Sequence, residues 1–390
     1  MDNKSKIRWT IVLGTACAWF GQHCGSGFCS GVQIAMYHGR LGFWSLFSTV
    51  IPFILLAFAF YNMGEYARRI KAHSYKEVAS TLYSDNAAVG KVTLFLWDLS
   101  VLSNVLISGG AVVAGAATLL QQVFGFNYAL SSIVFAIIVT VICMFGAIGL
   151  TRISLPLVGI MVVLIGIVAT VLIRENWTGL EQIVVTQDTF EATPYLAVRN
   201  TIIYTGLASN FICAFMAIAP NFNNSKESKY TAIFGAILNC VMLSLVSLAL
   251  LSCMPGIADA KLPILQMISD RFGIGGGLTV AYQGGLYLAY VTTGVGNVFA
   301  AVSRFGAVFN KQEVRNQKLV DALLAIAFLT VAVFMAQFGL AALVDKGYKF
   351  LSYMRFPLYV LGGLIFVPIR FRSWKKKEAA QVQTEAEVQA

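Results

Sequence analysis

Polar residues and glycines interrupt the first long apolar segment of the chain. The stretch from Gly21 to Gly31 reads GQHCGSGFCSG, with four glycines in eleven residues. Glycine disfavours helix by about 1 kcal/mol relative to alanine, so this density predicts either close helix packing or an unwound helix. An unwound stretch exposes N–H groups that attract an anion and carbonyls that attract a cation. The polar cluster of Gln22, His23 and Ser26 favours unwinding, because polar groups at that depth usually face a cavity.

Two later segments carry similar clusters. Small or polar residues interrupt IIYTGLASNFICAF near the middle of its span, namely Tyr204, Thr205, Gly206, Ser209 and Asn210. The segment AYVTTGVGN places Thr292 and Thr293 next to each other, with Ala289 one helical turn earlier. Threonine hydroxyls in membrane helices often bond to carbonyls of their own helix, and this alternative stays open for the pair.

The composition places these clusters in a membrane protein. The 390 residues are 58% hydrophobic and 12% charged, whereas soluble domains carry about 25% charged residues. Runs long enough to cross about 30 Å of hydrocarbon recur along the chain. About ten spans are predicted, near 8–37, 43–63, 92–121, 128–149, 153–173, 196–222, 229–254, 278–309, 319–339 and 351–370. The sequence therefore predicts an all-α polytopic membrane protein.

The interrupted spans occupy matching places in two halves of the chain. The spans divide five and five, into a first repeat at 8–173 and a second at 196–370, and the first span of each repeat is broken. Transporters built from inverted repeats pair two discontinuous helices in this way. We expect residues 1–370 to form a single transmembrane transporter domain and residues 371–390 to form a mobile cytoplasmic tail.

The charge distribution indicates orientation and not nucleic-acid binding. The formal net charge is +10, but the basic residues lie mainly in short loops between apolar segments. Placing the N-terminus in the cytoplasm puts most Lys and Arg on the inner side, as the positive-inside rule requires. We therefore predict a multi-pass protein of the plasma (inner) membrane, with both termini cytoplasmic and the lipid bilayer as its surroundings. The seven cysteines lie in or beside apolar segments and are predicted to be small buried hydrophobes without disulfides.

Few charged residues fall inside the predicted spans. Asp98 lies near the cytoplasmic third of the third span, where gating or structural support is favoured over substrate binding. Asn104, about two turns deeper on roughly the same face, is better placed for a pocket. Arg355 lies near the outer end of the last span and is interpreted as an arginine that extends to the interface. The loop 64–91 spaces apolar residues at helical intervals, which favours a short interfacial helix as much as a solvated loop.

The first interruption resembles a known family. Its residues GSGF, at Gly25–Phe28, resemble the glycine-rich break in the first helix of amino acid–polyamine–organocation transporters. The longer GSGFCSGVQ is similar to the GAGFASGQE-type signature of YkvI-like membrane proteins, a branch of that superfamily. The layout of the spans resembles the LeuT fold over about residues 8–370. The resemblance implies a LeuT-like 5+5 inverted repeat in which helices 1 and 6 are discontinuous.

The resemblance also implies binding residues. In sodium-coupled members, the ion lies between carbonyls at the first-helix break and a small residue plus two hydroxyls on the eighth helix. The implied Na⁺ ligands are Gly21, Cys24, Ala289, Thr292 and Thr293. Together with the candidates from the polar clusters, the predicted substrate-binding residues are His23, Gly25, Ser26, Gly27, Asn104, Tyr204, Gly206 and Ser209.

The break departs from the family pattern in two ways, and in the first Ser26 and Cys29 replace small alanines of the YkvI-like signature. His23 stands inside the break, where the family has small residues. Three roles are open for it: contacting the substrate, carrying a coupling proton near neutral pH, or filling space.

These observations predict a secondary active transporter, a symporter that couples Na⁺ to a small amino-acid-like or other carboxylate or zwitterionic solute. The alternatives are a proton-coupled carrier using His23 or Asp98, and a passive channel or transporter-like sensor. No Walker, HExxH or GxSxG motif occurs, so neither enzyme activity nor a cofactor beyond Na⁺ is predicted. The spacing of His23, Cys24 and Cys29 matches no soft-metal site. The solute's identity and the oligomeric state are left open.

Overall fold

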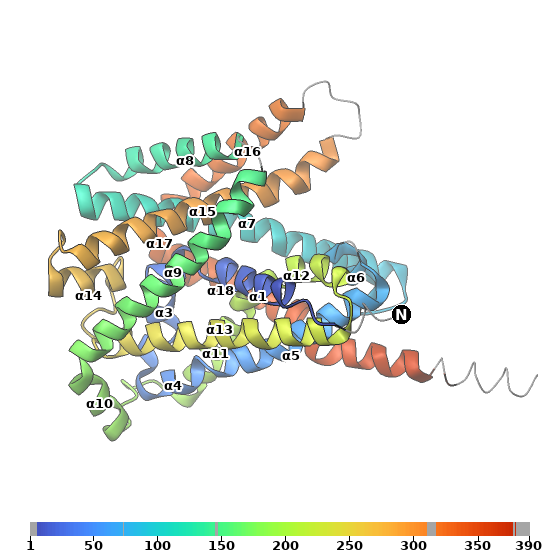
Figure 1. The fold of residues 1–390 in the computed structure, drawn as a ribbon, viewed down its shortest axis with the longest axis horizontal. Coiled ribbons are helices and arrows are strands. Elements are labelled where there is room, and N and C mark those ends of the chain that lie inside the picture. Colours follow the sequence, from blue (N-terminus) through green and yellow to red (C-terminus); the bar gives the residue numbers. More distant parts are fainter. Residues whose placement is uncertain (1–5, 73, 145–146, 310–316, 377–378, 380–390) are drawn as a thin grey trace, which may run out of the picture.

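The computed structural model describes residues 6–72, 74–144, 147–309, 317–376 and 379. Throughout these ranges the regular secondary structure is helical, without a strand. The long helices run roughly along one axis, with α5, α11 and α13 on one side of the bundle and α7, α8, α15 and α16 on the other (Figure 1). This arrangement confirms the predicted all-α polytopic architecture.

The first predicted repeat begins with a helix that is interrupted into three pieces, α1, α2 and α3. Its elements are α1 (Trp9–His23), α2 (Ser26–Cys29), α3 (Val32–Tyr37), the 3₁₀ turn η1 (Gly39–Trp44), α4 (Ser45–Ser48), α5 (Ile51–Ile70), α6 (Tyr75–Thr81), α7 (Ala87–Phe124), α8 (Tyr128–Met144) and α9 (Ala147–Glu175). Between the repeats lies α10 (Trp177–Thr186).

The second predicted repeat begins with a helix that also changes its conformation midway. Its elements are α11 (Pro194–Ala208), η2 (Ser209–Phe211), α12 (Ile212–Ile218), η3 (Ala219–Asn221), α13 (Ser225–Leu251), α14 (Pro263–Phe272), α15 (Gly277–Phe309), α16 (Gln317–Ala336), α17 (Leu340–Ala342), η4 (Leu343–Gly347), α18 (Tyr348–Arg355) and η5 (Phe356–Phe366).

Each predicted span coincides with a helix or a run of helices, but some boundaries differ. The third helix, α7, begins at Ala87 because the Asn86 side chain accepts a hydrogen bond from Ala88 N at 2.8 Å and so caps its first turn. The last span begins at Leu340, eleven residues before the predicted start at 351. Hydropathy excluded this extension because it contains Asp345, Lys346 and Lys349, although its backbone is helical.

Composition and length support a membrane-spanning bundle. Within the described ranges, five helical segments are long and apolar enough to cross a membrane, or six if Gly39–Ser48 and Ile51–Ile70, bent by 49°, form one span. The five are Ala87–Phe124, Val158–Glu175, Pro194–Asn221, Ser225–Leu251 and Leu340–Lys376. The helices α8 and α16 are apolar but shorter, and α1 is interrupted.

The two ends of the bundle carry different short helices. The start of α1, the end of the last helix and α6 lie at one end, and α10 and α14 lie at the other (Figure 1). A short helix in the loop 64–91 was one of two predictions, and α6 confirms it. The proposed tail at 371–390 is helical as far as residue 376, and most of the rest lies outside the described residues.

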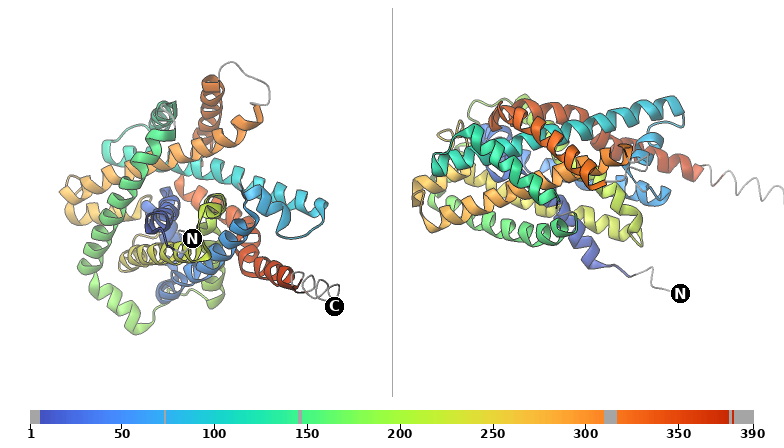
Figure 2. Two further views of the ribbon diagram at one scale, coloured as in Figure 1. Left: turned by 45° about the vertical axis from the view of Figure 1, so that its right-hand side comes forward. Right: turned by 90° about the horizontal axis from the view of Figure 1, so that it is seen from above.

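The first helix lies inside the bundle. Figure 2 shows α1 surrounded by the other helices when the molecule is turned by 45°. Trp19 is buried and stacks on Phe60 of α5 with ring centroids 3.9 Å apart. Gly235 of α13 makes room for this ring, because a Cβ atom there would lie 2.3 Å from Trp19. All seven cysteines are free thiols; Cys24 and Cys29 are buried as predicted, whereas the other five are only partly buried.

Candidate substrate and cation site

The backbone of the first helix breaks between His23 and Ser26. Gly25 is extended (φ −83°, ψ −166°), and its N–H donates to His23 O at 2.8 Å. In a continuous helix this N–H would bond to the Gly21 carbonyl, four residues earlier. The break therefore takes the helical partner away from Gly21 O and confirms the predicted discontinuity.

The second break is a tightening of the helix and not an unwinding. After α11 the chain forms one 3₁₀ turn, η2, and then continues as α12. Side chains donate hydrogen bonds to two backbone carbonyls at this junction. Ser209 Oγ donates to Gly206 O at 2.7 Å, and Trp19 Nε1 donates to Ala208 O at 3.3 Å. This hydrogen bonding explains how a helix end survives inside an apolar bundle.

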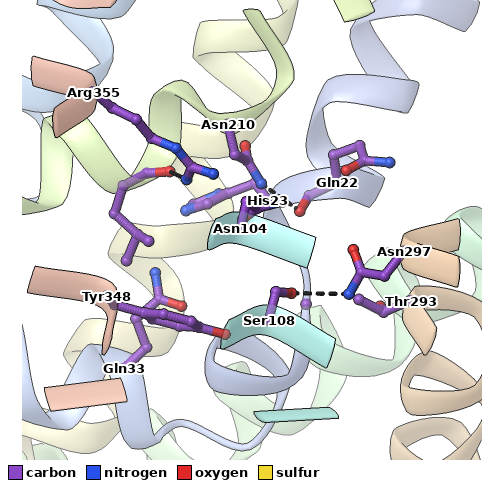
Figure 3. Close-up of a pocket in the computed structure, with 12 residues that line it drawn as sticks. Gln22, His23, Gln33, Asn104, Ser108, Asn210, Thr293, Asn297, Tyr348 and Arg355 are labelled. Atoms are coloured by element: carbon purple, nitrogen blue, oxygen red, sulfur yellow. Dashed lines mark hydrogen bonds between the residues drawn. The ribbon is translucent and has the colours of Figure 1, made fainter. Parts of the chain in front are cut away.

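A small cavity lies between the two breaks. Its volume is about 40 Å³, whereas pockets that enclose drug-sized ligands measure roughly 300–1,000 Å³. This cavity is therefore too small to enclose a drug-sized ligand. Residues from both breaks and from α3, α7, α15 and α18 line it: Gln22, His23, Gly25, Gln33, Asn104, Ser108, Leu207, Asn210, Thr293, Asn297, Tyr348 and Arg355 (Figure 3).

Some of the predicted site residues line the cavity together. His23, Gly25 and Asn104 among the predicted substrate residues line it, and so does Thr293 among the predicted Na⁺ ligands. Ser26 lies one contact away, with its Oγ 3.4 Å from the hydroxyl of Tyr348.

Four predicted substrate residues support the lining instead of forming it. A Cβ atom on Gly27 would lie 3.0 Å from Gln33 Oε1, so this glycine allows Gln33 to approach. On Gly206 it would lie 2.6 Å from Ser352 O, so that glycine permits close contact between α11 and α18. Ser209 bonds within its own turn, and Tyr204 is buried behind His23.

Both ring nitrogens of His23 are engaged by neutral protein groups. Nδ1 lies 2.8 Å from Asn239 Oδ1, and Nε2 lies 3.0 Å from the Tyr204 hydroxyl. Asn239 Nδ2 donates to Gly235 O at 2.8 Å, which turns the amide carbonyl toward His23. Nδ1 therefore donates to Asn239 Oδ1, and in a neutral ring Nε2 accepts from the Tyr204 hydroxyl. These bonds join α1 to α11 and α13.

The predicted cation ligands fall into two groups. A Cβ atom on Gly25 would lie 3.7 Å from Thr293 Cγ2, so the break of α1 lies directly against Thr293 of α15. Thr292 instead donates to carbonyls of its own helix, Leu288 O at 3.0 Å or Ala289 O at 3.1 Å. The Cys24 carbonyl accepts from Cys29 Sγ at 3.3 Å.

Sequence reasoning did not assign eight of the twelve lining residues to the pocket. Ser108 lies four residues after Asn104, and Asn297 lies four residues after Thr293, so helical periodicity was a usable signal for both. Asn297 Nδ2 donates to Ser108 Oγ at 3.0 Å and joins α15 to α7. The other six come from the two interrupted helices and from α3 and α18: Gln22, Gln33, Leu207, Asn210, Tyr348 and Arg355.

Two charged residues of the predicted spans differ in their relation to the cavity: Asp98 lies outside it, and Arg355 lines it. The carboxylate of Asp98 accepts a 2.6 Å hydrogen bond from Tyr75 of α6, outside the cavity, which supports the structural interpretation. Arg355 was interpreted as an interfacial arginine. That interpretation is wrong, because only 2% of the residue is exposed and it lines the cavity.

Comparison with known proteins gives likeness at the level of structure. Neither a protein-family profile nor a curated protein sequence matches the chain. A Na⁺-coupled sialic acid symporter in a substrate-bound outward-open state aligns with TM-score 0.54 and 15% identity, covering 92% of this chain and 86% of that one.

Two further solved structures are similar. Mhp1, a nucleobase-cation-symport-1 family transporter with bromovinylhydantoin bound, aligns with TM-score 0.53 and 15% identity, covering 88% of this chain and 74% of that one. The Eremococcus coleocola manganese transporter mutant H236A aligns with TM-score 0.50 and 15% identity, covering 92% and 86%. At this identity the likeness shows the fold alone. The chain has the LeuT fold, the inverted-repeat architecture of these transporters.

Proposed function

We propose that the chain is a secondary active transporter, a symporter that couples Na⁺ to a small amino-acid-like or other carboxylate or zwitterionic solute. One observation carries the proposal: the break at Gly25 lies against Thr293, a hydroxyl-bearing residue of α15, and both residues line the cavity. Broken helices supply such groups to cations and substrates in transporters of this kind. The GSGFCSGVQ stretch supports membership of the YkvI-like branch.

The proposed Na⁺ ligands are neutral oxygens. They are the carbonyls of Gly21, Cys24 and Ala289 and the hydroxyls of Thr292 and Thr293. Gly21 O has lost its helical partner, and Thr293 lines the cavity, which makes these two the strongest of the set. Thr292 would have to turn its hydroxyl from its own helix carbonyls to take part.

Proton coupling has weaker support than Na⁺ coupling. Both ring nitrogens of His23 already have neutral partners, and neither partner carries a negative charge that would stabilise an imidazolium. Asp98 is tied to Tyr75 outside the cavity. We therefore favour the cation over the proton as the coupling species.

The orientation and location belong to the same proposal. We place the protein in the plasma (inner) membrane with both termini cytoplasmic. The positive-inside distribution supports this orientation. The position of α6 at the same end as the start of α1 and the end of the last helix also supports it (Figure 1).

The test is thermal stability of the purified protein in NaCl and in choline chloride at matched ionic strength. A ligand that binds only the folded state raises the unfolding midpoint. We expect a Na⁺-specific upward shift that Thr293→Ala abolishes and Thr292→Ala weakens less. Thr170→Ala is the matched control, because Thr170 is exposed on α9 and bonds to its own helix at Gly166 O (2.7 Å).

Flux measurements separate a carrier from a channel. In proteoliposomes with a Na⁺ gradient, a symporter shows saturable uptake and counterflow of its solute. Flux without saturation would indicate a passive channel. Equal midpoints in Na⁺ and choline for the wild-type chain would refute the sodium site and shift the proposal toward proton coupling.

A further inference from the structure

Arg355 is a buried cation in the cavity wall. It ends α18, only 2% of it is exposed, and its side chain points inward from that helix (Figure 3). It is the only charged residue among the described residues that line the cavity. A charged group at such a position in a membrane protein usually marks a substrate pathway.

The protein leaves most of the hydrogen-bonding capacity of Arg355 unused. A guanidinium carries five N–H donors. Nη1 makes a long contact of 3.5 Å to Leu207 O, and the buried Nε has no partner. Among the described residues no carboxylate forms an ion pair with it. A buried charge needs a counter-charge, so Arg355 is suited to pair with an anion from outside the chain.

Asn210 presents the complementary group in the same cavity. Its Nδ2 donates to Gln22 O at 2.8 Å, which fixes the orientation of the amide. Its carbonyl oxygen, Oδ1, is buried without a hydrogen-bond partner. The cavity therefore contains an unsatisfied donor on Arg355 and an unsatisfied acceptor on Asn210.

We propose that Arg355 binds the carboxylate of the transported solute and that Asn210 Oδ1 accepts a hydrogen bond from a donor on the same solute. This inference rests on the proposed function and assigns its solute to carboxylates that also carry an N–H or O–H group. The planar guanidinium matches a carboxylate in two parallel bonds, which a spherical halide does not allow. The four-residue α2 is too short to provide a helix-terminus anion site. We therefore assign anion recognition to Arg355, at the end of α18.

A purely structural role for Arg355 predicts different behaviour. In that role the guanidinium only caps the carboxyl end of α11 through Leu207 O, and its removal lowers stability under all conditions. If Arg355 binds a solute, replacing it removes a buried cation that has no counter-charge in the free protein. Arg355→Met then melts at the same temperature as the wild type or higher when no carboxylate is present.

The experiment measures unfolding midpoints at pH 7.5 in sodium chloride, with sodium formate, sodium acetate or glycine added at constant Na⁺. Small carboxylates are chosen because the cavity is about 40 Å³. We expect saturable stabilisation of the wild type, an apparent Kd at least tenfold weaker in Arg355→Met, and an intermediate value in Arg355→Lys. Arg40→Met is the control, because Arg40 is exposed and pairs with Asp259 outside the cavity.

A second variant tests the acceptor. Asn210→Leu keeps the size of the side chain but removes the carbonyl. We expect this variant to bind formate with an affinity near that of the wild type, and to lose the preference for glycine over acetate. Glycinamide, which has the amine without a carboxylate, should stabilise neither form.

Three outcomes would overturn the inference. They are no saturable stabilisation of the wild type by any carboxylate, equal stabilisation of Arg355→Met, or a lower midpoint of Arg355→Met in sodium chloride alone. Uptake of an uncharged solute with Na⁺ dependence would leave the symporter proposal intact and refute the role of Arg355. Carboxylate binding through Arg355 without a Na⁺ effect would support the role of Arg355 and refute coupling to Na⁺.

Discussion

Asn210 Nδ2 donates a hydrogen bond of 2.8 Å to the carbonyl oxygen of Gln22. The donor lies in η2, at the break of the sixth span, and the acceptor lies at the end of α1, before the break of the first. The two interrupted helices are thus bonded to each other at their breaks, beside the cavity. Movement of one half of α1 must either carry α11 with it or break this bond.

The bond between Tyr204 and His23 gives the first prediction. Tyr204→Phe removes the hydroxyl 3.0 Å from Nε2 and leaves a buried acceptor without a partner. The cost is about 1–3 kcal/mol of stability. We expect a lower unfolding midpoint but an unchanged Na⁺ shift. Tyr353→Phe is the control, because Tyr353 is 59% exposed.

The same geometry predicts little pH dependence. Because both hydrogen-bond partners of the ring are uncharged, we expect His23 to stay neutral during Na⁺ binding. We expect the Na⁺-induced shift to be equal at pH 6 and pH 8. A shift that disappears at pH 6 in the wild type but persists in His23→Gln would make His23 a proton carrier and contradict this assignment.

Gly31 is predicted to be irreplaceable. Its φ is +85°, and a Cβ atom would lie 2.7 Å from Ile264 Cγ1. Gly31→Ala should cost about 2 kcal/mol or more, because a strained backbone and a close contact add up. Gly14→Ala is the matched control inside α1, where nothing lies within 4 Å of the added atom. Equal expression and equal midpoints for both variants would refute the conformational requirement.

Arg8 and Glu227 form an ion pair between the start of α1 and the start of α13, with Arg8 NH2 2.8 Å from Glu227 Oε2. The Glu227 side chain is fully buried, and the Arg8 side chain is 36% exposed. Arg8→Met should cost about 2 kcal/mol, because it leaves a buried carboxylate without its cation.

A double-mutant cycle with Glu227→Gln measures the coupling between Arg8 and Glu227. The exposed pair Arg271 and Glu175 is the comparison, and Arg271→Met should cost about 1 kcal/mol or less. A coupling energy near zero for Arg8 and Glu227 would show that the pair does not hold α1 in place.

Tyr75 holds Asp98 through a 2.6 Å hydrogen bond and fastens α6 to α7. Tyr75→Phe should lower stability by about 1–3 kcal/mol, since the bond is to a carboxylate. The Na⁺ shift should not change. Tyr195→Phe, at a side chain 75% exposed, is the control. Loss of transport in Asp98→Asn with normal stability would instead support the proton-coupled alternative.

The sequence alone determined the membrane class, the helical spans and the two interrupted helices. These features depend on local composition: apolar runs long enough for a bilayer, and glycine or polar residues at mid-depth. The residues at the first break, Gly25 and His23, were predicted for this reason. Asn104 and Thr293 were found because helical periodicity and the family resemblance, respectively, extend to them.

The tertiary structure alone decided which side chains face the cavity and which of them are already satisfied. Tyr204 and Ser209 belong to the right helix, yet their hydroxyls bond inside the protein, at His23 and Gly206. Arg355 resembled an interfacial residue in the sequence, because its distance from the end of a span says nothing about the neighbours that bury it. Burial and hydrogen-bond partners come from helices far apart in the chain, so only the packed bundle determines them.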